Sequence, residues 1–206
     1  MHIAEGILSS PVLAGGAVAA IAGITIGLRA IRPQDTPRVG VTAAALFVVS
    51  LLHIPIGVGS AHLILNGLAG LLLGWAAFPA FFVALLLQAI LFQFGGLTTL
   101  GVNTCIMAIP AVVVHYLFRA SVRKTGWNAA LSAFLAGAFA LALSGAVLAA
   151  TLVVGGDQAF VPAAKAIFAA HLPLMPLEGA ICVFSVAFFR KVSPRIFHSA
   201  TSREVS

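Results

Sequence analysis

Long apolar runs dominate the chain, and only short polar segments separate them. The runs cover residues 11–28, 39–56, 61–78, 79–94, 100–118, 127–154 and 174–189. A helix that crosses the hydrocarbon core of a bilayer needs about 20 residues, most of them apolar. The pattern therefore predicts an all-α membrane protein, a bundle of about seven transmembrane helices.

The boundary between the third and fourth runs is the weakest of these divisions. Only residues 75–79 separate the two runs, although Gly74 can end one helix and Pro79 can begin the next. A bundle of six helices is the alternative.

The composition excludes a water-soluble fold. Hydrophobic residues make up 61% of the 206 residues and charged residues only 8%, whereas charged residues make up about 25% of an ordinary soluble domain. We expect residues 1–192 to form a single transmembrane helical domain in membrane lipid and residues 193–206 to form a short polar tail. Residues 1–10 carry no Lys or Arg, so the start of the chain does not resemble a cleaved secretory signal.

The basic residues predict the orientation of the bundle rather than a nucleic-acid partner. The net charge is +6, but the Lys and Arg residues form three clusters that follow apolar runs, and only Lys165 falls elsewhere. The clusters are Arg29, Arg32 and Arg38; Arg119, Arg123 and Lys124; and Arg190, Lys191, Arg195 and Arg203. With seven spans all three lie on one face, which the positive-inside rule assigns to the cytoplasm. The N-terminus is then outside and the C-terminal tail is cytoplasmic.

The N-terminus offers a set of nitrogen donors for a metal ion. The chain begins Met1-His2-Ile3-Ala4-Glu5-Gly6, and we expect the initiator Met1 to be retained because His2 is large. The α-amine of Met1, the backbone nitrogen of His2 and its near ring nitrogen can close two chelate rings in one plane, which leaves a position for one further imidazole. Planar coordination by nitrogen suits Ni²⁺ or Cu²⁺, whereas Mg²⁺ and Ca²⁺ prefer oxygen and structural Zn²⁺ prefers a tetrahedron.

His53 and His62 are the candidates for that further imidazole. Both flank the same predicted external connection, and His62 is better placed because it opens an apolar run beside a Gly-rich turn. The alternatives are that a histidine at position 2 is accidental and that His62 only caps a helix. Glu5 could neutralise a bound cation, but a carboxylate is also favourable near a helix N-terminus, and we expect Glu5 to cap the first helix.

Further polar residues collect on the same predicted side of the membrane. Thr98 and Asn103 lie in the loop sequence Gly-Gly-Leu-Thr-Thr-Leu-Gly-Val-Asn, and His171 and Glu178 flank a segment with two prolines. Ionisable side chains and irregular backbone at membrane depth mark functional sites. These four residues are candidates for orienting the imidazole ligands. The alternative for His171 and Glu178 is a helix kink with a local ion pair.

At these residues the sequence resembles the substrate-binding membrane subunit of energy-coupling factor importers for nickel and cobalt, the CbiM/NikM family. The resemblance is carried by the opening Met1-His2-Ile3-x-Glu5-Gly6, the turn at His62, the run from Gly95 to Asn103, and His171 with Glu178-Gly179. It implies a seven-helix bundle in which the Met1 amine, the His2 amide and imidazole, and an external-loop histidine bind the metal. That histidine maps to His62.

The loop around His62 departs from the family pattern. It reads Gly59-Ser60-Ala61-His62-Leu63-Ile64-Leu65-Asn66-Gly67, where nickel or cobalt specialists are richer in glycine or carry Cys-Ser-His-Pro. The choice between Co²⁺ and Ni²⁺ is therefore open, as is a role of His53 as a substitute or auxiliary ligand. Asn66 is a candidate local contact of the ligand loop.

The resemblance also implies partners and a location. The family works with a transmembrane coupling subunit, cytoplasmic ATPase subunits and often a small accessory membrane subunit, in the inner cell membrane, and supplies metal for cobalamin biosynthesis. This chain has no GxxxxGK[ST] motif, so we expect no enzymatic activity of its own. We expect no permanently bound cofactor, with Co²⁺ or Ni²⁺ as the transported substrate.

Two other functions were weighed. A stand-alone secondary permease for divalent metals predicts buried carboxylates along a path, and within the apolar runs only Glu178 qualifies. An intramembrane enzyme predicts an HExxH motif or a nucleophile with an adjacent base, and neither is present in the sequence.

Overall fold

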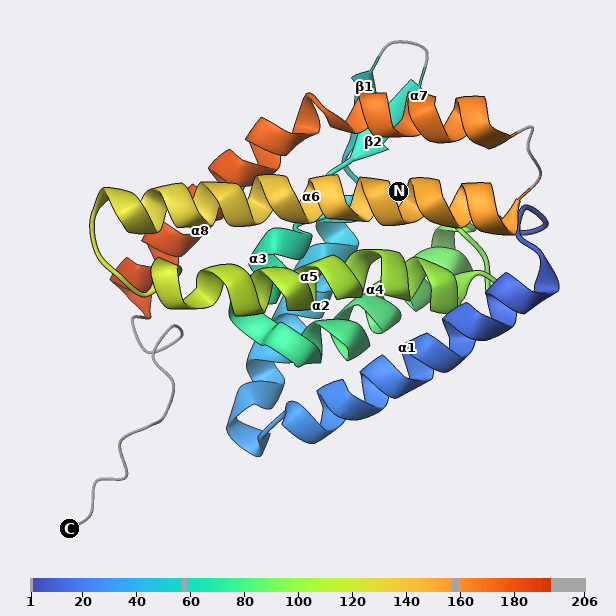
Figure 1. Cartoon of the computed structure of the whole chain (residues 1–206). Coiled ribbons are helices and arrows are strands. Elements are labelled where there is room, and N and C mark those ends of the chain that lie inside the picture. The colour runs from blue at the N-terminus through green and yellow to red at the C-terminus, as the bar shows by residue number, and fades with distance from the viewer. Residues whose placement is uncertain (1, 57–58, 157–159, 194–206) are drawn as a thin grey trace.

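The computed structural model describes residues 2–56, 59–156 and 160–193, and shows a bundle of helices with one short β-hairpin (Figure 1). The helices are α1 (Ser10–Ala30), α2 (Thr36–Ser50), α3 (Asn66–Leu73), α4 (Ala77–Phe92), α5 (Leu100–Val122), α6 (Trp127–Gly155), α7 (Val161–His171) and α8 (Leu174–Val192). The 3₁₀ turns η1 (Pro33–Asp35) and η2 (Gly74–Ala76) precede α2 and α4, and the strands are β1 (His53–Ile56) and β2 (Gly59–His62).

The short helix α3 lies in the interior of the bundle. It packs against α5, α6 and α8, and seven of its eight residues are buried. Its glycines permit this close approach, because a Cβ atom at Gly67 would lie 2.6 Å from the carbonyl oxygen of Ala136, and one at Gly70 would collide with the backbone of Ala111. Small residues at helix contacts let backbones approach closely in membrane proteins.

Among the described residues, fewer helices are long and apolar enough to cross a membrane than the seven predicted. Four described segments are long and apolar enough: α1, α3 together with α4, α5, and α6. The pair α7 and α8, bent by 42° between them, would make a fifth. The predicted third span is wrong as a separate crossing, because the eight residues of α3 are only about 12 Å long at 1.5 Å per residue. The break predicted at the two prolines is confirmed by the bend between α7 and α8.

The hairpin corrects the prediction of an entirely helical chain. Residues 53–56 and 61–62 were assigned to spans, but the chain leaves α2 at Ser50 and forms an antiparallel pair in which His53 lies opposite His62. Pro55 lacks the N–H that a helix would need, and Ile54 and Ile56 are β-branched and favour a strand. The hairpin therefore places His62 at the end of β2, shortly before the start of α3.

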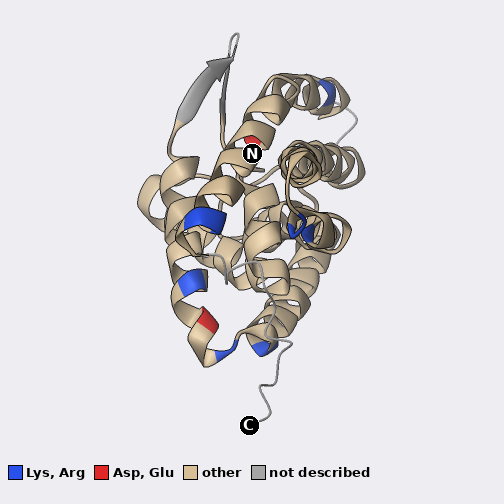
Figure 2. Cartoon of the chain, turned by 90° about the vertical axis from the view of Figure 1, so that its left-hand side faces the viewer, with Lys and Arg blue, Asp and Glu red and all other residues tan. Residues whose placement is uncertain are grey.

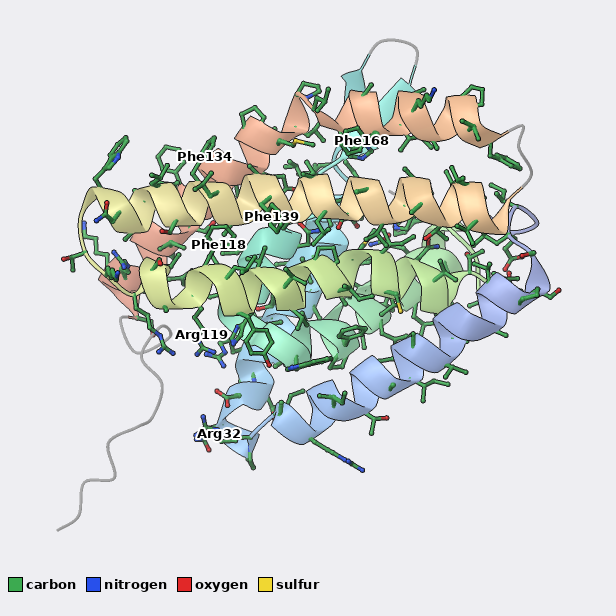
Figure 3. All side chains as sticks on the ribbon, viewed as in Figure 1. Arg32, Phe118, Arg119, Phe134, Phe139 and Phe168 are labelled. Carbon is green, nitrogen blue, oxygen red and sulfur yellow. The ribbon has the colours of Figure 1, made fainter. Side chains whose placement is uncertain are left out.

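The basic residues gather at one end of the bundle. Arg32 and Arg119 lie at the same end in Figure 3, and Figure 2 looks onto this end. Arg190 of α8 donates hydrogen bonds to the carbonyl oxygens of Val122 and Lys124, so the ends of α5 and α8 are joined there. The start of α1 lies at the other end of the bundle, where the N–H of Ser9 donates to the carbonyl of Gly155 at 2.7 Å. The predicted clustering on one face is thus confirmed for the described residues.

Candidate metal centre

Asn103 holds the N-terminal segment inside the bundle. The N–H of Ile3 donates to Asn103 Oδ1 at 2.9 Å, and Asn103 Nδ2 donates to the carbonyl of Ile3 at 3.1 Å. Nδ2 also donates to Thr99 Oγ1 at 3.2 Å. Both Ile3 and Asn103 are only 2% exposed, so this pair of bonds is shielded from water. His2 is fixed next to it, whereas the predicted Met1 amine lies outside the described residues.

The glycine-rich loop before α5 closes over the same segment. The N–H of Thr98 donates to Glu5 Oε1 at 3.2 Å, and the Glu5 side chain occupies the space that a side chain at Gly96 would need. The expectation that Glu5 caps the first helix is wrong, because α1 begins with Ser9 as its N-cap and has no acidic residue in its first turn. Thr98 contributes its backbone N–H while its side chain is exposed. The neighbouring hydroxyl of Thr99 is the one that contacts Asn103.

The structure brings the rings of His2 and His62 together. Their centroids are 5.0 Å apart with an interplanar angle of 25°, so the two imidazoles are stacked. His62 is only 4% exposed, and its Nδ1 lies 3.0 Å from the carbonyl oxygen of Leu63. A carbonyl oxygen can only accept, so this contact places a proton on Nδ1 and leaves the lone pair of a neutral ring on Nε2. His62 is therefore held in the tautomer that can bind a metal through Nε2.

A buried carboxylate fixes the segment that follows His62. Glu178 of α8 is fully buried, and its Oε1 accepts hydrogen bonds from the N–H groups of Ile64 at 2.5 Å and Leu65 at 3.0 Å. Its Oε2 lies 3.1 Å from the same Leu65 nitrogen. The carboxyl group sits at the N-terminus of α3, where backbone N–H groups have no partner within the helix. The chain turns sharply at this point, since Leu65 has a φ of +56°.

His171 and Asn66 have hydrogen-bond partners on helices of the bundle. Among the described residues the predicted ion pair between His171 and Glu178 does not form, and His171 Nδ1 instead lies 2.6 Å from the carbonyl of Ile167 on its own helix. Asn66 is a candidate contact of the ligand loop; its amide donates to Ser144 Oγ at 2.6 Å and to the carbonyl of Ala140 at 3.1 Å, and so ties α3 to α6. The backbone of His53 pairs with that of His62, and its side chain is outside the described part of the chain.

Side chains alone do not complete a metal site in the described residues. Within residues 2–56, 59–156 and 160–193 no group of three or more His, Cys, Asp and Glu residues is arranged to hold a metal ion. Sequence reasoning missed Thr99 and Gln88, although Gln88, one of two glutamines in the apolar run 79–94, is the kind of buried polar residue that marks a functional position.

Comparisons with known proteins show similarity in sequence and fold to metal transport proteins. Residues 2–196 match the family described as "Cobalt uptake substrate-specific transmembrane region", CbiM. A protein of Haemophilus influenzae assigned to metal transport is 42% identical over 200 residues, which cover 96% of this chain and 97% of that protein. A protein of Archaeoglobus fulgidus named as a fused nickel transport protein, NikMN, is 33% identical over 204 residues, covering 95% of this chain and 68% of that one. The crystal structure of a truncated transition metal transporter superposes with a TM-score of 0.78 at 26% identity, covering 93% of this chain and 99% of that chain.

Replacing the buried carboxylate tests whether it holds the His62 segment. In Glu178→Gln the amide NH₂ faces backbone donors, so we expect the amide protons of Ile64 and Leu65 to exchange about 10 to 100 times faster, because leaving a buried donor without an acceptor costs about 1–3 kcal/mol. Hydrogen–deuterium exchange of the purified protein in detergent measures this. Asp35→Asn, which removes a carboxylate from ion pairs at the basic end, is the control. Unchanged exchange at residues 64 and 65 in Glu178→Gln would contradict the assignment.

Proposed function

The chain belongs to the CbiM family, whose model describes the substrate-specific transmembrane region of cobalt uptake, and from this premise we propose that it captures Co²⁺ or Ni²⁺ outside the cell for an energy-coupling factor importer. The observation that carries the proposal is the stacking of His2 and His62 at a centroid distance of 5.0 Å. These residues are 60 positions apart in the sequence. The fold brings them together at the point where the N-terminal segment enters the bundle.

In this proposal the ion is bound by four nitrogens. They are the Met1 amine, the backbone nitrogen and ring nitrogen of His2, and Nε2 of His62. The tautomer set by the Leu63 carbonyl supports the last of these. All four donors are borderline nitrogen ligands, which suit both Ni²⁺ and Co²⁺ and disfavour Mg²⁺ and Ca²⁺.

Asn103 and Glu178 act as positioning residues for this site. Asn103 forms hydrogen bonds with both the N–H and the carbonyl of Ile3. Because Ile3 follows His2 directly, these bonds limit where His2 can move. Glu178 fixes the two residues after Leu63. The auxiliary roles of His53 and His171 remain predictions.

The orientation of the bundle follows from the basic end. The positive-inside rule assigns the end that carries Arg32, Arg119 and Arg190 to the cytoplasm, so the ion enters from the end where α1 begins. Residues 1–192 are then one transmembrane domain in the inner cell membrane, and residues 193–206 are a cytoplasmic tail.

Energy for import comes from partner subunits in this proposal. A transmembrane coupling subunit, ATPase subunits and a small accessory membrane subunit complete the importer, and the fused form of the Archaeoglobus fulgidus relative supports an association with further transport components. A stand-alone permease is less well supported. Glu178 is the one buried carboxylate among the described residues, and it already accepts hydrogen bonds from the backbone N–H groups of residues 64 and 65.

Removal of the loop imidazole tests the ligand set. We expect His62→Ala to weaken Co²⁺ or Ni²⁺ binding by more than about 100-fold, since loss of even an outer contact to a metal ligand typically costs about 10- to 100-fold. Isothermal titration calorimetry on the purified full chain gives the affinity. His198→Ala in the C-terminal tail is the matched control. An affinity in His62→Ala equal to that of the wild type would exclude His62 as a ligand.

Proton competition gives a second test. Every proposed donor must lose its proton to bind the metal, and a free α-amino group ordinarily has a pKa of about 7.7–8.0. The affinity should therefore fall by about 10- to 100-fold for each unit by which pH is lowered from 8 to 6, because the amine and the amide each release a proton on binding. Titrations at four pH values in buffers that do not bind metals measure the slope. An affinity that does not change over this range would rule out the amine and the amide as donors.

A further inference from the structure

An open groove lies at the basic end of the bundle, between α2 and α8. It has a volume of about 440 Å³ and is bordered by the start of α2, by Leu72 of α3 and by the end of α8. Among the described residues α2 packs mainly against α4, and α2 and α8 do not pack closely on each other. Val41, Leu72 and Phe189 give the groove apolar walls. We call it the α2–α8 groove.

Positive charge is in excess at the mouth of the α2–α8 groove. Arg38 and Asp35 both line it, and Arg38 Nη2 donates to Asp35 Oδ1 at 3.1 Å. The Nε of Arg32 lies 3.6 Å from the other oxygen of the same carboxylate, and the charges of Arg38 and Asp35 also act on Arg119. Figure 3 shows Arg32 and Arg119 at this end of the bundle. Three guanidinium groups therefore share one carboxylate.

Two of these guanidinium groups keep a buried donor without an acceptor. Among the described residues neither Nε of Arg38 nor Nε of Arg119 has a hydrogen-bond partner, although both atoms are buried. Leaving a buried donor unpaired is costly, and native proteins keep few such groups. The planar guanidinium group matches the oxygens of a phosphate, which it can bind through two N–H groups. Arg38 therefore suits an anionic oxygen that enters the groove.

A phospholipid matches both parts of the groove. Its phosphate can meet the guanidinium group at the mouth while an acyl chain covers the apolar walls, of which Val41 is 71% exposed in the chain alone. A free anion would leave these walls uncovered. Basic pockets between transmembrane helices on the cytoplasmic side bind the head groups of anionic lipids, and the positive-inside rule assigns this end to the cytoplasm.

We propose that the α2–α8 groove binds one anionic phospholipid of the cytoplasmic leaflet, with its phosphate at Arg38 and an acyl chain along Val41, Leu72 and Phe189. The inference goes beyond metal capture and rests only on the membrane orientation given above. The lipid would join α2 to α8 at the end where the two helices do not pack closely on each other. It would also hold the basic end of the bundle at the charged surface of the membrane.

Native mass spectrometry of the purified full chain counts the lipids that the protein retains. The protein is mixed in neutral detergent with equal amounts of phosphatidylglycerol and phosphatidylcholine that carry the same acyl chains. The wild type should retain phosphatidylglycerol at least about fivefold better, because each basic residue near an anionic lipid favours binding by about that factor. Arg38→Gln should abolish this preference. Arg29→Gln, which removes an exposed arginine at the same end, is the matched control and should keep it.

A second pair of variants tests the apolar wall without changing the charge. Val41 is 71% exposed and Val48, about two helical turns further along α2, is 57% exposed, so a tryptophan at either position should be tolerated. Val41→Trp should fill the groove and lower the retention of phosphatidylglycerol by at least about tenfold, because a packed tryptophan removes the room for an acyl chain. Val48→Trp, which lies outside the lining of the groove, should retain the lipid like the wild type.

Several results would overturn the proposal. They are equal retention of the two lipids by the wild type, an effect of Arg38→Gln no larger than that of Arg29→Gln, and equal effects of Val41→Trp and Val48→Trp. Displacement of the lipid by excess inorganic phosphate would mark a plain anion site and would also overturn it.

The C-terminal segment and the metal centre provide two further checks. Phe197→Ser should leave lipid retention unchanged, and a severalfold gain would show that the C-terminal segment, rather than a lipid, occupies the groove. All the variants should bind Co²⁺ like the wild type, because the proposed metal centre lies at the other end of the bundle. Failure of the lipid site therefore leaves metal capture standing, whereas a wild type that does not bind Co²⁺ refutes the proposed function and leaves the lipid site standing.

Discussion

The hydrogen bonds of Glu178 to the backbone N–H groups of Ile64 and Leu65 are the constraint on which the candidate metal centre depends. Removing a carboxylate from water is costly, and it is tolerated only where donors or an opposite charge replace the lost solvation. Here the donors are main-chain groups at the N-terminus of α3, and among the described residues no cationic side chain forms an ion pair with Glu178. The arrangement fixes the backbone beside His62, at a place where a cation is proposed to bind.

The part of the centre that contains His2 is held in place by a residue of α5. Asn103 secures Ile3, while Glu178 belongs to α8, and both of these helices pack against α6. A polar chain also ties these elements to α3, because Asn66 donates to Ser144 of α6 and Ser144 donates to the carbonyl of Ile106 on α5 at 2.9 Å. The meeting of His2 and His62 is therefore a property of the packed bundle, and neither the N-terminal segment nor the hairpin could produce it alone.

Much of the fold could be predicted from the sequence, and the wrong predictions share physical causes. The apolar runs predicted α1, α5 and α6 well, and the spacing of Lys and Arg predicted the basic end, because both signals are local. Hydropathy cannot distinguish a long span from the short buried helix α3, since both are apolar. The partners of Glu178 were missed because backbone N–H groups carry no sequence signature, and an ion pair with His171 was the nearest visible alternative. Glu5 was misassigned for a related reason: its partner, the N–H of Thr98, lies 93 residues away.

The N-terminal amine is the part of the account that no side chain can replace, and it is tested most directly by adding one glycine ahead of Met1. Such an extension converts the amine into an amide, moves the charge away and leaves His2, His62 and the bundle in place. We would compare Ni²⁺ and Co²⁺ binding of the native and extended proteins by calorimetry. The account predicts that the extended protein loses the tight site for both metals, whereas equal affinity in the two proteins would contradict a metal centre built on Met1 and His2.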